Sequence, residues 1–168
     1  MLDLTPIEYI RPENILTIKF PDGAVGTGNF TYTLGQDVYT PRGYFYHLIG
    51  VTFTLLTGVT AGTRNPYIAF SSFGQNMYYR TRDELGIPAS ITMKYSAAFG
   101  IGFGAVLQGS FSSNATVASP EINRKMWGLP LLILTPPDDI VVDITGVTVT
   151  DQVINRAYRF LRSTRKVA

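Results

Sequence analysis

The chain has 168 residues and a formal net charge of +2, so it fits one domain with a full hydrophobic core. Charged residues make up only 15% of it and hydrophobic residues 45%, whereas an average soluble domain is about 25% charged. The absence of cysteine excludes disulfides, zinc–cysteine centres and thiol nucleophiles, and the small net charge argues against a general nucleic-acid-binding protein. A surface so poor in charge predicts permanent association with other subunits.

The amino-terminal part is expected to form an extended arm over residues 1–13. Its first six residues lack the basic start and apolar run of a signal peptide, so no export signal is expected. Prolines and glycines then divide the chain into pieces typical of short strands joined by turns. The first predicted strands cover residues 14–20, which a turn at 21–23 ends, and residues 30–34.

The strongest predicted strand covers residues 45–55, where the odd positions are apolar except for His47. This period of two predicts that the odd positions face the core. Residues 44–63 carry no charge, but their threonines and glycines favour a strand and turn over a membrane-spanning helix. A turn at 61–66 and a strand at 67–70 complete a predicted antiparallel hairpin.

Further strands are predicted at residues 76–80 and 89–97. No charged residue occurs between Lys94 and Glu121, and this segment is expected to hold two weak strands and to lie partly against another chain. An apolar strand at 131–134, a turn at 136–139 and an alternating strand at 140–144 follow. Gly146 is interpreted as a bulge before residues 147–149.

The last segment fits two structures. Residues 153–161 form a helical stripe behind a possible Asp151 cap, but they also fit a strand with Ile154, Tyr158 and Phe160 on one face with Arg156. The strand is favoured because the neighbouring segments are rich in sheet. Residues 163–168 are predicted to be a basic tail. The predicted fold class is all-β, with residues 1–168 forming a single antiparallel β-sandwich.

No catalytic, metal or cofactor site is predicted, and the chain is expected not to be an enzyme. His47 is the only histidine, and no Gly-x-Ser-x-Gly sequence offers a nucleophile. Asp138, Asp139 and Asp143 are candidate calcium ligands, but the Pro-Pro-Asp-Asp turn accounts for them more simply. The glycine clusters at 23–28 and 100–104 lack the spacing of phosphate-binding loops.

Arginines recur at every third position of the carboxyl-terminal segment, at Arg156, Arg159, Arg162 and Arg165. A guanidinium group binds either phosphate or the carboxylates of a neighbouring subunit. Because the net charge is small, pairing with a neighbouring subunit is the favoured hypothesis.

From His47 onward, the order of elements resembles a group of small tailed-phage virion proteins. The similar elements are the alternating strand 48–55, the turn 62–66, the strand 67–70, the segment 129–132, the strand 141–149 and a closing strand that begins with Asp151 and Gln152. The resemblance implies a jelly-roll-like sandwich in a capsid decoration, cement or minor tail protein. It also implies a location in the virion and contacts with the major capsid protein or other virion subunits.

The expected partners are protein subunits, including copies of the chain itself, for which a trimer is the guess; neither a membrane nor a nucleic acid is expected. Composition points to the arm, to residues 95–120 and to the tail as contact regions. The interface candidates are Tyr95, Phe99, Phe103, Phe111, Arg156, Arg159, Arg162 and Arg165.

The alternative function is a carbohydrate- or receptor-binding module of a tail or fibre. Aromatic rings stack on sugars, and the candidates for such contacts are Tyr44, Tyr46, Tyr78, Tyr79 and the single tryptophan, Trp127.

Overall fold

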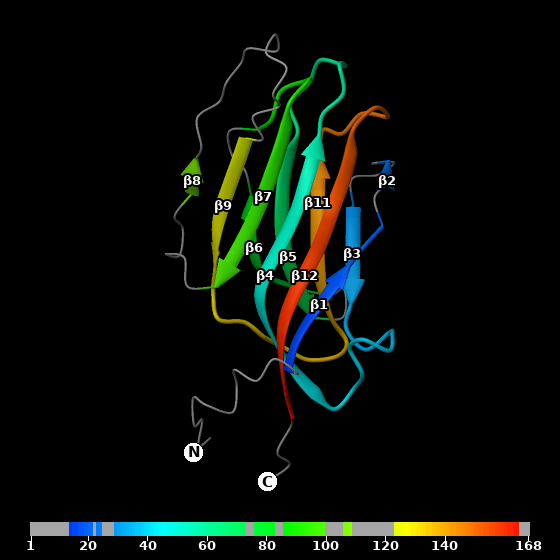
Figure 1. Ribbon diagram of the computed structural model, residues 1–168, viewed down its shortest axis with the longest axis vertical. Helices are drawn as coiled ribbons and strands as arrows, with labels where there is room; N and C mark the ends of the chain where they lie inside the picture. Colours follow the sequence, from blue (N-terminus) through cyan, green and yellow to red (C-terminus); the bar gives the residue numbers. More distant parts are fainter. Residues whose placement is uncertain are drawn as a thin grey trace.

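The computed structural model describes residues 14–21, 23–24, 29–72, 76–82, 86–99, 106–108 and 123–164. These residues form two β-sheets, seen in Figure 1 along the shortest axis of the molecule. Among them, no helix has the length and apolar character needed to cross a membrane. The prediction of an all-β fold is confirmed.

The larger sheet has the strand order β1-β12-β4-β7-β9-β8, with β2 also paired to β12 and β10 to β4. Its strands are β1 (Ile15–Lys19), β2 (Gly23–Ala24), β4 (Tyr44–Leu56), β7 (Thr92–Phe99), β8 (Val106–Gln108), β9 (Asn123–Leu129), β10 (Ile133–Leu134) and β12 (Gln152–Thr164). One pair, β7 with β9, is parallel. The described strands are therefore antiparallel except for this pair. Parallel strands need a longer crossover connection, because a tight hairpin joins only antiparallel strands.

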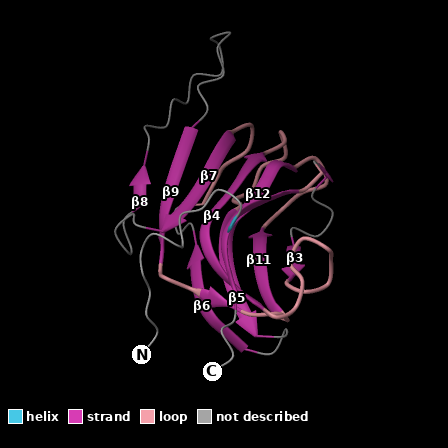
Figure 2. Ribbon diagram, turned by 60° about the horizontal axis from the view of Figure 1, so that its bottom comes forward, coloured by secondary structure: helices cyan, strands magenta, loops and turns pink. Residues whose placement is uncertain are grey.

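The smaller sheet has the order β3-β11-β5-β6. Its strands are β3 (Asn29–Thr33), β5 (Asn65–Ser72), β6 (Asn76–Arg82) and β11 (Asp138–Thr145). The chain passes repeatedly between the sheets, so that β12, β4 and β7 lie in one layer and β3, β11, β5 and β6 in the other (Figure 2). This jelly-roll-like arrangement is the one expected.

The hydrophobic core lies between the sheets and is built by the alternation of the strands. In β11, Ile140 and Val142 point inward and are fully buried, and in β7 Met93, Tyr95 and Ala97 do the same. An aromatic cluster joins β4, β7 and β9, with the Tyr95 ring stacked on Phe53 at a centroid distance of 4.8 Å. These alternations follow the predicted pattern.

The long strand β4 changes its inward-facing parity half way along. Tyr46 and Leu48 are buried in its first half, whereas Val51, Phe53 and Leu55 are buried in its second half. Opposite this point Arg159 pairs with Gly50 and Phe160 pairs with Leu48, so Ile49 is an extra residue and forms a β-bulge. The prediction that odd positions face inward is correct for residues 51–55 and wrong for residues 45–49.

A second bulge interrupts β12. Ile154 pairs with Thr54 and Ala157 with Thr52, and between them Asn155 has a φ angle of 53°. Asparagine adopts this left-handed conformation more readily than most residues. The predicted strand is confirmed, but the bulge separates Ile154, which is half-buried, from the buried face that Tyr158 forms further along.

Several predicted boundaries are corrected. Ser163 and Thr164 belong to β12 and pair with β4, so they are not part of a tail. Residues 147–149 form a loop, because β11 ends at Thr145 and Gly146 turns the chain with a φ angle of 76°. The predicted arm, residues 100–105, 109–122 and the tail from 165 onward lie outside the described residues.

Candidate interaction surfaces

The outer face of the larger sheet carries a row of mostly apolar side chains across four strands. Ile15 of β1 pairs with Leu161 of β12, Leu161 pairs with His47 of β4, and His47 pairs with Ile133 of β10. Paired residues point to the same face of a sheet. Ile15 is 43% exposed and Ile133 55% exposed, while the other two side chains are half-buried. We call these four residues the outer row.

On β4 and β7, the residues beside the outer row are small. Arg159 pairs with Gly50, and Gly50 pairs with Ala98 on the next strand. In the following row, Ala157 pairs with Thr52 and Thr52 pairs with Ser96. Small side chains let the backbone of a partner approach a sheet closely. The face therefore combines exposed isoleucines with small residues on β4 and β7 and with the exposed cations Lys19 and Arg159 on β1 and β12.

The charges of the larger sheet have one sign. Its eight strands contain no aspartate or glutamate, and their cationic residues are Lys19, Lys94, Arg124, Lys125, Arg156, Arg159 and Arg162. On the smaller sheet, by contrast, the outward positions of β11 include Asp139 and Asp143, which accept hydrogen bonds from Thr33 and Tyr67. The strands of the smaller sheet carry both signs, since β6 contains Arg80 and Arg82, whereas those of the larger sheet are cationic only.

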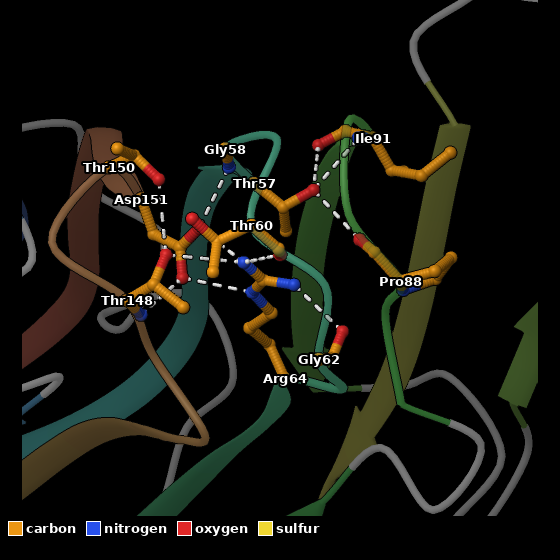
Figure 3. A network of polar contacts seen from close by, with 10 residues as sticks. All are labelled: Thr57, Gly58, Thr60, Gly62, Arg64, Pro88, Ile91, Thr148, Thr150 and Asp151. Atoms are coloured by element: carbon orange, nitrogen blue, oxygen red, sulfur yellow. Dashed lines mark hydrogen bonds and ion pairs between the residues drawn. The ribbon is translucent and has the colours of Figure 1, made fainter.

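A buried ion pair joins two loops at one end of the sandwich (Figure 3). Arg64 lies just before β5 and Asp151 just before β12, and both side chains are fully buried. The guanidinium binds the carboxylate with two hydrogen bonds, from Nε to Oδ2 at 2.9 Å and from one terminal nitrogen to Oδ1 at 3.0 Å. Such bidentate pairing fixes the relative orientation of the two groups.

The remaining polar atoms of this pair also find partners. Arg64 donates to the carbonyl oxygens of Gly62 and Thr60, and Asp151 accepts from the backbone N–H groups of Gly58 and Thr148. The hydrogen bonds therefore tie the loop between β4 and β5 to the loop between β11 and β12. We call Arg64, Asp151 and their partners the loop clamp.

The loop clamp makes the free energy of unfolding depend on pH in the acidic range. Burial alone would raise the pKa of Asp151, but hydrogen bonds from Arg64, Gly58 and Thr148 and the Arg64 charge lower it from 3.8 to about 2. A carboxyl group with a lower pKa in the folded chain stabilises the fold above its unfolded pKa, and this stability is lost as pH falls through its folded pKa. We therefore expect about 2 kcal/mol of unfolding free energy to disappear between about pH 4 and pH 2.

Urea denaturation across this pH range measures the effect. The control is the double variant R64M/D151L, which lacks the pair and should lose about 2 kcal/mol less over the same range than the wild type. Identical losses in the two proteins would contradict the assignment to Asp151.

The clamped loops expose no charged side chain. Residues 57–63 and 145–150 consist of threonine, glycine, valine and alanine, and Val59 and Val149 are 84% and 91% exposed. Arg64 and Asp151 are the ionisable residues of these loops, and each neutralises the other in the interior. The clamp thus holds these two uncharged loops in one conformation. The sequence alone places Arg64 in a turn and Asp151 either at a helix cap or at the start of the closing strand, and it does not pair them.

The predicted interface residues differ in their exposure to solvent. Tyr95 is fully buried in the core, so its side chain is not available at the surface, and this expectation is corrected. Phe99, at the end of β7, is 50% exposed, and Arg159 is exposed on the outer face. Phe103, Phe111 and Arg165 lie outside the described residues. The structure therefore leaves Phe99 and Arg159 as accessible candidates.

Two of the predicted arginines pack against aromatic rings. The guanidinium of Arg156 lies 4.4 Å from the ring centroids of both Phe20 and Phe30, and burial lowers its pKa. Arg162 lies 5.0 Å from the centroid of the Tyr44 ring. Cation–π contacts of this kind stabilise the chain itself. Arg159 is the described arginine of this series that remains exposed to solvent.

Two of the five aromatic residues of the carbohydrate hypothesis are buried inside the protein. Trp127 is 1% exposed and packs on Tyr95, so it cannot stack on a sugar ring. Tyr46 is fully buried, its hydroxyl donates to the carbonyl oxygen of Pro41, and burial raises its pKa to about 12. Tyr44 is half-buried under Arg162. The side chains of Tyr78 and Tyr79 are outside the described part of the chain.

The polar residues considered for catalysis or metal binding take part in the packing and hydrogen bonding of the fold. His47 is half-buried in the outer row, and burial lowers its pKa. Asp138 accepts a hydrogen bond from the N–H of Thr135 and so closes the predicted turn. The described residues contain no cluster of three histidine or acidic side chains that could hold a metal ion.

Neither a protein-family model nor a curated protein matches the chain.

Proposed function

We propose that this chain is a non-enzymatic structural subunit of a tailed-phage virion, of the capsid decoration or cement type. It stabilises the shell through contacts with the major capsid protein or other virion subunits, made in many copies. The observation that carries this proposal is the outer row, which places two exposed isoleucines on the outward face of an otherwise well-packed sandwich.

The energetics favour a lattice protein. Fully burying an isoleucine contributes about 1.5–3 kcal/mol, so covering the exposed parts of Ile15 and Ile133 contributes about 1 kcal/mol each. This is small for a single contact, and many equivalent contacts in a shell multiply it. A sparsely charged surface also loses little hydration energy when a neighbour covers it.

The fold and its edge strand support the same function. Jelly-roll-like sandwiches occur in viral capsid domains and in lectins. The lectin alternative needs accessible aromatic rings, and Trp127 and Tyr46 are buried. At the end of the larger sheet, β1 pairs with β12 alone in the described part of the chain. Among the described residues no strand pairs with its other edge, which could therefore accept a strand from a neighbouring subunit.

The experiment compares the incorporation of two variants into particles. In cells infected with the phage that encodes the chain, wild-type protein is expected in purified particles in many copies, measured by quantitative mass spectrometry. Ile133→Asp places a charge in the outer row and should lower incorporation about tenfold or more.

The matched control is Val38→Asp, because Val38 is 85% exposed in the loop between β3 and β4 and lies outside the outer row. It should be incorporated as well as the wild type. Absence of the wild-type chain from purified particles would overturn the proposed function, and normal incorporation of Ile133→Asp would remove the outer row from it.

A further inference from the structure

We infer that the outer face of the larger sheet binds the amino-terminal segment, residues 1–13, of a second copy of this chain. This deepens the proposed function, on which it rests, by naming the contact that joins copies to one another. Three observations carry it: the charges of the face, the apolar outer row, and the composition and length of the segment.

The face offers cations that no carboxylate of the described chain neutralises. Lys19 and Arg159 are exposed on the outer face of β1 and β12, and Lys94 is half-buried on β7. The described carboxylates accept hydrogen bonds elsewhere, for example Asp143 from Tyr67 and Asp151 from Arg64. A partner with carboxylates therefore complements this face.

The face is also apolar, which narrows the class of partner. An exposed ion pair contributes at most about 1 kcal/mol, so the cations alone hold a partner weakly. The outer row adds Ile15, Leu161 and Ile133, and these need apolar side chains opposite them. A nucleic acid would use the cations and leave the isoleucines uncovered. The fitting occupant is a peptide segment that alternates acidic and apolar residues.

Residues 1–13 have this composition. Asp3, Glu8 and Glu13 are acidic, and they are interspersed with the apolar residues Leu2, Leu4, Ile7, Tyr9 and Ile10. Arg11 is the one basic residue, so the side chains of the segment carry a net charge of −2, from three acids and one arginine. The sign is opposite to that of the outer face.

The segment has the necessary reach. Four strand spacings separate β1 from β9 in the larger sheet, which is about 19 Å. Thirteen extended residues span up to about 43 Å. The segment joins β1 at Asn14, directly before Ile15 of the outer row.

Charge reversal in the full chain tests the inference by sedimentation velocity. The wild type is expected to form oligomers. Lys19→Glu with Arg159→Glu, or Asp3→Lys with Glu8→Lys, should weaken self-association about tenfold or more, because like charges then face each other. Combining all four changes should restore it. Arg42→Glu, on an exposed loop residue, is the control and should leave self-association unchanged.

Circular dichroism and thermal melts of every variant establish that the exposed changes leave the fold intact. A monomeric wild type, an oligomer insensitive to Lys19→Glu with Arg159→Glu, or a combined variant that stays dissociated would overturn the inference. Binding of a fluorescent DNA oligonucleotide that depends on Arg159 would also overturn it. If the wild type is a monomer but still enters particles, only this inference is wrong. If it forms oligomers through residues 1–13 but is absent from particles, only the proposed function is wrong.

Discussion

Replacing Arg64 with methionine is expected to lower the free energy of unfolding by about 3–5 kcal/mol. The change removes the guanidinium and leaves the carboxylate of Asp151 fully buried without its charge partner. It also leaves the carbonyl oxygens of Gly62 and Thr60 without donors. An unpaired buried charge costs far more than the intact pair contributes. Urea denaturation at neutral pH, with circular dichroism as the signal, measures the loss.

The double variant R64M/D151L shows how much of this loss of stability comes from the unpaired carboxylate of Asp151. With both charges replaced by apolar side chains of similar size, most of the lost stability should return. The double-mutant cycle should then give a coupling energy of about 2 kcal/mol or more. A single R64M change that costs less than about 1 kcal/mol would mean that the loop clamp is not closed in solution.

Replacing Tyr95 with alanine is expected to destabilise the fold by about 3–5 kcal/mol. The Tyr95 ring is fully buried, stacks on Phe53 at 4.8 Å and contacts Trp127 at the same centroid distance. Truncation removes two aromatic contacts and leaves a cavity between β4, β7 and β9. Equilibrium denaturation of the isolated protein measures this effect.

Phe99 is the matched control on the same strand. Its ring is 50% exposed at the end of β7, so Phe99→Ala should cost about 1 kcal/mol or less in the isolated protein. Equal and small losses for both variants would contradict the position of Tyr95 in the core.

The fold class could be predicted because the strands alternate clearly where one face is polar. β11 is an example, since Ile140 and Val142 alternate with Val141 and Asp143. The bulge in β4 could not be predicted in this way. Phe45, Tyr46, Leu48 and Ile49 are all apolar or aromatic, so the sequence around the bulge offers no contrast between the two parities.

The outer row and the position of Tyr95 were harder to predict from the sequence. The outer row exists only because Ile15, Leu161, His47 and Ile133, which are far apart in the chain, are brought into register by strand pairing. Tyr95 looked like an interface residue because it begins a charge-free segment, but that property also fits a core strand.

The loop clamp did leave a signal in the sequence. Arg64 is the one charged residue in positions 43–79, and Asp151 is the one charged residue in positions 144–155. Two isolated opposite charges in uncharged surroundings are candidates for a buried pair, because buried charges are stable only with a partner. The pairing itself requires the loops at one end of the sandwich to meet, which only the topology reveals.

The functional meaning of the clamp lies in positioning. A buried ion pair contributes little net stability compared with apolar residues of the same size. It does fix two loops relative to each other, and these two uncharged loops expose Val59 and Val149. Loops held in one conformation lose less entropy when a neighbour covers them.

Hydrogen–deuterium exchange of the protein, free and bound to purified particles, tests the central claim most directly. The account predicts that backbone amides of β1, residues 15–19, the outermost described strand on this side of the larger sheet, exchange much more slowly in the particle than in solution. Unchanged exchange along β1, together with protection confined to the smaller sheet, would contradict it.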